Sequence, residues 1–226
     1  MASVHNFGDR REAGQLLARE VARLNLSDPV VLALPRGGVP VGYEVAKLLR
    51  APLDILLVRK IGAPGHEEYG IGALVDGASP QVVIDEQAAK AVGADRGYID
   101  REVERQLAEI ERRRAAYRTG PPIPLKGRTV IVADDGIATG GTVQAALKAL
   151  ARIAPARIVL AVPVAPSDTL ARLGSFCDEI VCLAQPRSFY AVGAHYIHFD
   201  QTPDSEVVSL LAEAKRWAKG EGPRET

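Results

Sequence analysis

The sequence has few of the residues that mark several common protein classes. Its 226 residues include only two cysteines, Cys177 and Cys182, which lie five positions apart. Neither a disulfide scaffold nor a zinc site fits this pattern, so both thiols are expected on or beside a strand. No apolar run approaches the roughly 18 residues of a membrane span, and the N-terminus lacks the basic and then apolar profile of a signal peptide. These absences predict a cytoplasmic protein.

The chain also lacks an excess of charge of either sign. Its formal net charge is +0 and its isoelectric point is about 6.9, so no overall field would attract it to nucleic acid or to a membrane. A nucleic-acid interface would need a local basic stripe, and the most charged segment, 98–118, carries both signs. We therefore expect neither a nucleic-acid nor a membrane partner.

Short apolar runs alternate with helical patterns along most of the chain. This alternation predicts an α/β protein whose mainly parallel sheet is covered by helices on both faces, with ligands at the carboxyl ends of the strands. Two further β-like runs, 71–75 and 81–84, are separated by Asp76-Gly77, which is a hairpin signal. Strands are expected at 30–34, 53–58, 128–133, 156–164 and 178–183, and helices at 40–49, 142–152, 167–173 and 204–219.

The stretch 86–118 departs from this alternation because it is long, charged and helical. We interpret it as an insertion in a single domain that spans residues 1–226. Its narrow apolar face is expected to pack on the protein's own sheet or on a second copy in a homodimer, while the charges pair along the solvent side. That face consists of Val103, Leu107, Ile110 and Tyr117.

The most informative segment is VIVADDGIATGGT at 130–142. A buried strand ends in Asp134 and Asp135, and a loop with paired glycines then enters a helix. Glycines permit close approach of a ligand, and a helix start offers free N–H groups, which together suit a phosphate dianion. The two carboxylates lie upstream of the loop and are better placed to accept hydrogen bonds from hydroxyls about one sugar ring away. Binding of a ribose 5-phosphate group would therefore explain both the glycine loop and the two acids.

Other phosphate sites do not fit these residues. A Walker A loop needs a lysine where the sequence has Gly140-Gly141-Thr142, and the dinucleotide fingerprint of spaced glycines is missing. The remaining alternative is a strand, turn and helix whose Asp pair binds nothing. Burial of Asp134 and Asp135 in ion pairs away from any cavity would contradict a ligand site.

Segment 130–142 resembles the signature of type I phosphoribosyltransferases, which has four apolar residues, two acids, a short spacer and Thr-Gly-Gly-Thr. The resemblance implies a five-stranded parallel core, a hood (here about 186–219) and the donor 5-phosphoribosyl-1-pyrophosphate (PRPP), bound with Mg²⁺. It implies that Asp134 and Asp135 hold the ribose hydroxyls and are the candidate protein contacts of Mg²⁺. The implied 5′-phosphate loop consists of Ala138, Thr139, Gly140, Gly141 and Thr142.

Two other segments match the side of the family's site that binds diphosphate. Arg36-Gly37-Gly38 resembles the pyrophosphate loop, with Arg36 as a planar anion donor. Arg59-Lys60 corresponds to the mobile loop that closes over the diphosphate, a movement that would exclude water during transfer. The alternatives are a plain strand-to-helix turn and an exposed strand end. The resemblance makes Asp134, Asp135, Arg36 and Lys60 the candidate catalytic residues.

The acceptor is less constrained by the sequence. Ala138 stands where the 6-oxopurine branch of the family carries an acid, which counts against hypoxanthine and guanine. Tyr190, with Tyr196 and Phe199, is a candidate wall for a planar base. The alternative is that these aromatic side chains form a small secondary core under the last helix.

The resemblance implies a Mg²⁺-dependent transferase of nucleotide metabolism. It would move the phosphoribosyl group from PRPP to a nitrogen nucleophile, most simply a nucleobase, and release diphosphate. The alternative is a regulatory protein that senses PRPP without turnover. Such a regulator would act through protein contact, because neither a helix-turn-helix nor a basic face is apparent. The acceptor and any general base are left open.

Overall fold

The computed structural model describes residues 6–77, 80–117 and 121–218. Its main sheet has five parallel strands in the order β2-β1-β6-β7-β8, which confirms the mainly parallel α/β fold. The predicted strand 53–58 is shorter than expected, because the sheet strand ends at Ile55. The strands are β1 (Pro29–Ala33), β2 (Leu53–Ile55), β6 (Thr129–Ala133), β7 (Arg157–Val164) and β8 (Glu179–Ala184).

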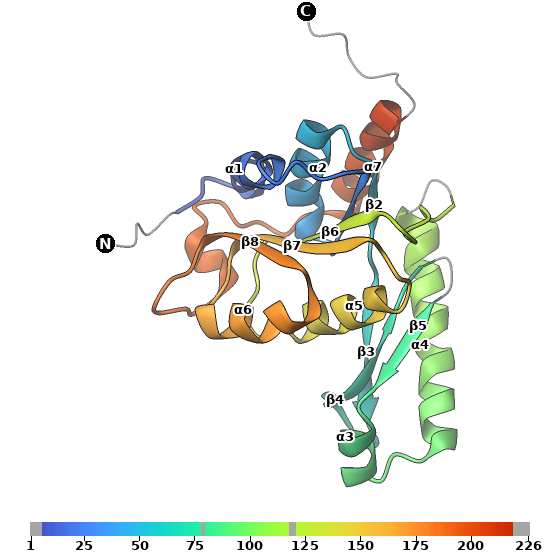
Figure 1. Cartoon of the computed structure of the whole chain (residues 1–226). Coiled ribbons are helices and arrows are strands. Elements are labelled where there is room, and N and C mark those ends of the chain that lie inside the picture. Colours follow the sequence, from blue (N-terminus) through green and yellow to red (C-terminus); the bar gives the residue numbers. More distant parts are fainter. Residues whose placement is uncertain (1–5, 78–79, 118–120, 219–226) are drawn as a thin grey trace, which may run out of the picture.

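Helices cover both faces of this sheet (Figure 1). Side chains alternate along each strand, so Val31 and Ile131 enter one core and Leu32 and Val130 enter the other. Burial of apolar side chains on both faces is what makes these strands near-continuous apolar runs. One face carries α1 (Arg10–Ala22), α2 (Gly38–Leu49) and α7 (Asp204–Ala218), and the other carries α5 (Gly141–Ala151), α6 (Ser167–Leu173) and the short η1 (Gly174–Phe176).

The final helix, which the sequence predicted as the closing part of a hood and helix at about 186–219, covers the sheet. Val207, Leu210 and Leu211 of α7 are buried in the same core as α2 and the strands β1 and β6. The apolar stripe of α7 is therefore used to cover the sheet. Only the irregular segment 185–203, with its short helix η2 (Val192–His195), lies between β8 and α7.

An arm extends from the β2 edge of the sheet (Figure 1). Its antiparallel strands β3, β4 and β5 confirm the hairpin predicted at Asp76-Gly77, and they have a small core of Ile61, Ala63, Ile71 and Ala89. The insertion therefore begins near residue 58, earlier than the helical stretch 86–118. Its elements are β3 (Val58–Ala63), β4 (His66–Val75), β5 (Gln81–Ile84), α3 (Glu86–Ala91) and α4 (Arg96–Tyr117).

The long charged helix α4 packs on its own chain, as the sequence predicted. Ile110 and Tyr117 are buried in the main core, and the Tyr117 hydroxyl donates to Asp204 Oδ1 of α7 at 2.5 Å. On the outer side, Glu109 accepts from Arg112 and Arg113. A homodimer through this helix stays a prediction, as does the single-domain organisation.

Both cysteines are free, with Cys182 on β8 and Cys177 just before it, as expected. Burial raises the pKa of the Cys182 thiol to about 11. Among the described helices, none is both long and apolar enough to cross a membrane.

Helix α1 begins at an N-cap whose removal should be measurable. Asp9 Oδ1 accepts from the amides of Arg11 and Glu12, each at 2.9 Å. Replacing Asp9 by alanine is expected to cost about 1 kcal/mol and to lower Tm by about 2–4 °C in calorimetry. The control Glu20→Ala removes only an exposed pair with Arg23 and should change stability by less than about 0.5 kcal/mol. Equal melting of the Asp9→Ala variant and the wild type would contradict this role.

Candidate functional site

The loop between β6 and α5 has the shape expected of an anion site. Ala138, Thr139, Gly141 and Thr142 are exposed, whereas Gly140 is buried with φ 76°. A Cβ on Gly140 would lie 2.9 Å from Thr169 Cγ2, so glycine is required for both conformation and space. Because the N-cap residue Gly140 has no side chain to cap the helix, the first amides of α5 are open to a ligand.

Helix α6 supports this loop from behind. The Thr169 hydroxyl donates to the Ala138 carbonyl at 2.9 Å, and Arg172 Nη2 donates to the Thr139 carbonyl at 3.0 Å. With these carbonyls bound on one side, the peptide units of the loop have a fixed orientation. Neither supporting residue was identified from the sequence, where nothing distinguishes them from other polar residues of a surface helix.

Asp134 and Asp135 follow β6 directly and lie in different environments. Asp134 is half-buried, and its Oδ1 accepts from the Asp135 amide at 2.9 Å. Burial raises the pKa of the Asp134 carboxyl well above its ordinary value, and the negative charge of Asp135 raises it further. Asp135 is instead paired with Arg10, whose Nε lies 2.7 Å from Asp135 Oδ2.

The diphosphate loop lies directly against these two acids. A Cβ on Gly37 would be 2.0 Å from Asp135 Oδ2, and one on Gly38 would be 2.8 Å from the Ala133 carbonyl oxygen. Since β1 and β6 are neighbours in the sheet, their carboxyl ends bring the two predicted loops into contact. The peptide bond between Pro35 and Arg36 is cis.

Arg36 itself points toward the last helix. Its Nη1 lies 3.7 Å from Asp204 Oδ1, and Asp204 also accepts from Tyr117. The long distance and partial exposure make this a weak pair. The side chain of Arg36, which belongs to the predicted diphosphate loop, is therefore held only loosely by its neighbour.

The predicted mobile loop at Arg59-Lys60 is wrong as a description of local structure. Both residues lie on strand β3 of the arm, and the chain turns at Pro64-Gly65 into β4. Arg59 Nε donates to Gln106 Oε1 of α4 at 2.9 Å, while Lys60 is exposed. Their approach to a diphosphate stays a prediction.

The aromatic cluster near the C-terminus divides into two parts. Tyr190 is 95% exposed, and its role in acceptor binding stays a prediction. Tyr196 is buried against Phe7, with ring centroids 5.4 Å apart, and Phe199 lies 5.0 Å from Tyr196. The alternative of a secondary core therefore holds for Tyr196, although this core packs on α1 and not under the last helix.

Two site residues come from parts of the chain that the sequence did not connect with the acids. Arg10 pairs with the Asp135 carboxylate, and the Tyr196 hydroxyl donates to the Asp135 carbonyl at 2.5 Å. Arg10 lies 125 residues before Asp135. The available signal was weak: a basic residue in the first turn of a helix is placed against the helix dipole, which suggests a partner elsewhere.

Arg10 also lines a cavity of about 260 Å³, whereas Asp134 and Asp135 are not among its lining residues. Only Asp135 of the two acids is in an ion pair with Arg10, and a ligand site at the acids stays a prediction. Further lining residues, from α1, α2, α7 and the segment before α7, are Asp9, Arg11, Pro40, His198, Asp200, Gln201, Thr202, Pro203 and Glu206.

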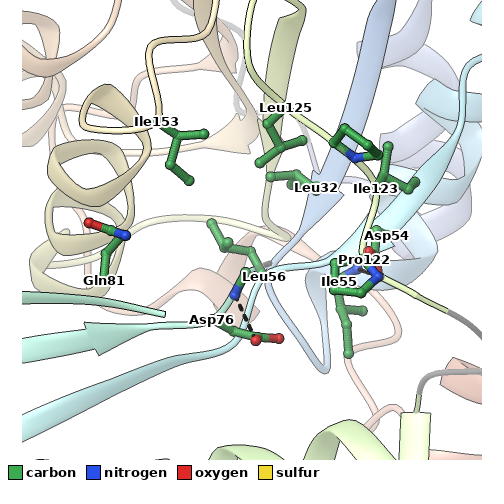
Figure 2. Close-up of a pocket in the computed structure, with 12 residues that line it drawn as sticks. Leu32, Asp54, Ile55, Leu56, Asp76, Gln81, Pro122, Ile123, Leu125 and Ile153 are labelled. Carbon is green, nitrogen blue, oxygen red and sulfur yellow. Dashed lines mark hydrogen bonds between the residues drawn. The ribbon is translucent and has the colours of Figure 1, made fainter. Parts of the chain in front are cut away.

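A second, more enclosed pocket of about 130 Å³ lies on the α5 face of the sheet (Figure 2). Leu32, Leu56 and Leu125 make most of it apolar, and the buried acids Asp54 and Asp76 add polar atoms. Neither the phosphate loop nor the diphosphate loop contributes to its lining. This pocket is therefore not the predicted sugar phosphate site.

Within the described part of the chain, no group of three His, Cys, Asp or Glu residues could hold a metal. Mg²⁺ in proteins typically keeps several waters and is bound by one or two carboxylates together with substrate phosphates. Asp134 and Asp135 supply that small donor set, so the residues fit a Mg²⁺ ion that is carried mainly by a diphosphate ligand.

Comparisons with known proteins agree with this geometry. A family model described as "Phosphoribosyl transferase domain" matches residues 4–185. A protein from two strains of Mycobacterium tuberculosis, named provisionally as a phosphoribosyl transferase, is 45% identical over 211 residues; the match covers 93% of this chain and 47% of that protein. The chain thus spans about half the length of these curated relatives. The crystal structure of TT1426 from Thermus thermophilus is 44% identical with a TM-score of 0.81, covering 92% of this chain and 98% of that one.

Proposed function

The chain belongs to the phosphoribosyl transferase family, and from this premise we propose that it binds PRPP with Mg²⁺ and transfers the phosphoribosyl group to a nitrogen nucleophile. The observation that carries the proposal is the contact between Gly37 of the diphosphate loop and the carboxylate of Asp135. On the other side, the 5′-phosphate loop follows the same acids within the chain. One ligand with phosphate at both ends of a ribose can therefore bridge all three parts.

Each part of the site would have a separate task in this proposal. The amides of loop 138–142 would bind the 5′-phosphate, and Asp134 and Asp135 would accept hydrogen bonds from the ribose hydroxyls. The diphosphate would lie at Gly37-Gly38, where the start of α2 and the side chain of Arg36 favour negative charge. Arg59 would have to leave Gln106 to reach the same diphosphate.

The reaction is a displacement at C1 of the ribose. The bond between C1 and the diphosphate oxygen breaks with its electron pair on the oxygen, and the acceptor nitrogen forms the new bond and loses its proton. Positive charge develops on the sugar, and the carboxylates of Asp134 and Asp135 would stabilise it while they orient the ring. Bound Mg²⁺ would neutralise charge on the departing diphosphate. No covalent intermediate with the protein is needed.

The acceptor is the part of the proposal that has the least support. Ala138 is exposed in the phosphate loop and offers no carboxylate to N7 of a 6-oxopurine. We therefore expect another nitrogen heterocycle, and place the protein in nucleotide metabolism. Tyr190, which is exposed within the irregular segment 185–203, is the candidate for stacking on such an acceptor.

Removal of Mg²⁺ is expected to weaken PRPP binding by at least about 10-fold. Without the cation, the diphosphate would bring its negative charge close to Asp134 and Asp135, and each 1.4 kcal/mol of repulsion corresponds to about 10-fold in affinity. The measurement is calorimetric titration of the folded protein with PRPP in Mg²⁺ and again in EDTA, with ribose 5-phosphate as the ligand that has no diphosphate. Absence of PRPP binding in Mg²⁺ would refute the proposed function.

Turnover is tested separately by release of diphosphate with a panel of nucleobases. Release with one base would identify both the enzyme and its acceptor. PRPP binding without release for any base would favour the alternative of a PRPP-sensing regulatory protein.

A further inference from the structure

Asp135 is held from two sides by residues outside the parallel sheet. Arg10 Nε, at the start of α1, donates to its carboxylate oxygen Oδ2 at 2.7 Å. The Tyr196 hydroxyl, from the segment after η2, donates to its carbonyl oxygen at 2.5 Å. The side chain and the backbone of one predicted sugar-binding acid therefore have fixed partners from both ends of the chain.

These two partners belong to one connected structure. The Phe7 amide donates to the His195 carbonyl at 2.9 Å, the Ile197 amide donates to the Phe7 carbonyl at 2.8 Å, and the His198 amide donates to the Gly8 carbonyl at 2.9 Å. The residues just before α1 are thus bound to 195–198 by a short ladder of backbone bonds. We call these two strips, 7–10 and 195–200, the clamp.

Arg10 joins the clamp to Asp135 through three separate contacts. Besides the carboxylate, its Nη1 donates to the Asp200 carbonyl at 2.6 Å, and its guanidinium carbon lies 3.9 Å from the centre of the Phe199 ring. A planar guanidinium with several donors can make these contacts together, whereas a lysine ammonium cannot. The rotamer of Arg10 is therefore determined by its surroundings.

The burial of the Arg10–Asp135 ion pair indicates that the pair acts mainly through its geometry. The side chains of Arg10 and Asp135 are only 12% and 14% exposed. A buried ion pair is a poor source of net stability, because desolvation offsets much of the attraction, so its geometric effect is the larger consequence. With Oδ2 held by Arg10, the second oxygen, Oδ1, has a defined direction in which to accept a hydroxyl.

We infer that Arg10 is a positioning residue of the sugar site, which fixes the Asp135 carboxylate for the ribose hydroxyls of PRPP and couples it to the clamp. This inference rests on the proposed function. Arg10 acts through Asp135 and needs no contact with the ligand. Its loss should therefore affect ligands that contain the ribose and spare inorganic diphosphate, which has no hydroxyl for Asp135.

The test compares Arg10→Ala and Arg10→Lys with Arg19→Ala by calorimetry. Arg19 is the matched control because it is an exposed arginine of the same helix α1 and does not line the cavity beside Arg10. Arg10→Ala is expected to weaken ribose 5-phosphate and PRPP by about 10- to 100-fold, the loss typical when a group that orients a metal ligand is removed. Arg10→Lys should recover part of this loss. Inorganic diphosphate with Mg²⁺ should bind all variants within about threefold, and Arg19→Ala should match the wild type.

The outcomes separate the inference from the proposed function. If the wild type does not bind PRPP, the proposed function itself fails. If the wild type binds and Arg10→Ala binds ribose 5-phosphate equally well, only the role of Arg10 is refuted. Equal loss of ribose 5-phosphate and diphosphate in Arg10→Ala, with no recovery in Arg10→Lys, would show a general structural role and would also refute it. If Arg10→Ala does not fold, the Arg10→Lys variant provides the test. A selective loss of affinity for ribose 5-phosphate in Arg10→Lys supports the inference. An unchanged ratio of the affinities for ribose 5-phosphate and inorganic diphosphate refutes it.

Discussion

Replacing Asp134 and Asp135 together by asparagine is expected to weaken PRPP binding by about 10²- to 10⁴-fold. Each carboxylate would accept a hydrogen bond from a ribose hydroxyl, and a bond to a charged group contributes roughly 1.5–3 kcal/mol. Two such bonds amount to about 3–6 kcal/mol, which converts to that change in affinity. Asparagine keeps the size of the side chain and one acceptor oxygen but removes the charge.

The fold should survive this double substitution. Burial and the neighbouring Asp135 raise the pKa of Asp134, so removal of its negative charge relieves a desolvation and repulsion cost in the fold. Arg10 loses its carboxylate but keeps the Asp200 carbonyl and the face of Phe199. Calorimetric titration with PRPP and thermal unfolding are the two measurements. The control is Asp100→Asn, which removes an exposed charge on α4 that pairs with Arg96. PRPP binding by the double variant within threefold of the wild type would exclude the acids from the sugar site.

Gly37→Ala is expected to weaken PRPP binding by about 100-fold through the addition of a single methyl group. The new Cβ would lie 2.0 Å from Asp135 Oδ2 and 3.1 Å from Arg10 Nε, so either the carboxylate or the loop must move by about 1 Å or more. Displacement of a binding group by that distance can cost on the order of 10² in rate or affinity. The backbone at Gly37 has φ −60° and ψ −31°, which alanine adopts readily, so contact and not conformational strain is the cause.

Gly174→Ala is the matched control for this effect. A Cβ at Gly174 would meet only Ile180 Cδ1 at 3.9 Å, which is an ordinary contact, and the residue lies in η1 away from both loops. PRPP titration and thermal unfolding of the two variants distinguish a local effect on the site from a loss of stability. Unchanged affinity in Gly37→Ala would show that the diphosphate loop can move without consequence for the ligand, and would remove the main support for the proposed function.

Much of the fold was predictable because its signals are local. Alternation of apolar runs and helical patterns predicted all five parallel strands, and Asp76-Gly77 predicted the β4–β5 hairpin. The strand, loop and helix around Asp134 form within one contiguous segment, so its glycines and acids could be interpreted together. The contact of Gly37 with Asp135 also follows from neighbouring parallel strands, whose carboxyl ends meet at one edge.

The arm was not predictable in the same way. Residues 53–58 form one apolar run, but the sheet strand ends at Ile55 and a new strand begins at Val58. Hydrophobic periodicity reports burial and does not report a change of strand direction. The loop at Arg59-Lys60 was implied by the family resemblance, and the structure instead agrees with the alternative of a strand. The surface that α7 covers was left unassigned for a related reason: an apolar stripe does not specify which surface it covers.

The chain's own order of residues therefore determined the α/β class and the strand, loop and helix that carry the pair of acids at the end of β6. The environment of those acids came from folding. Burial and the charge of Asp135 raise the pKa of Asp134, while Asp135 is paired with Arg10, which lies 125 residues away. Contacts between residues so distant in sequence depend on how helices pack across a sheet, and no local pattern of residues carries that information. The packing of α1 and the segment 195–200 against the end of β6 thus determines the orientation and the environment of the two carboxyl groups.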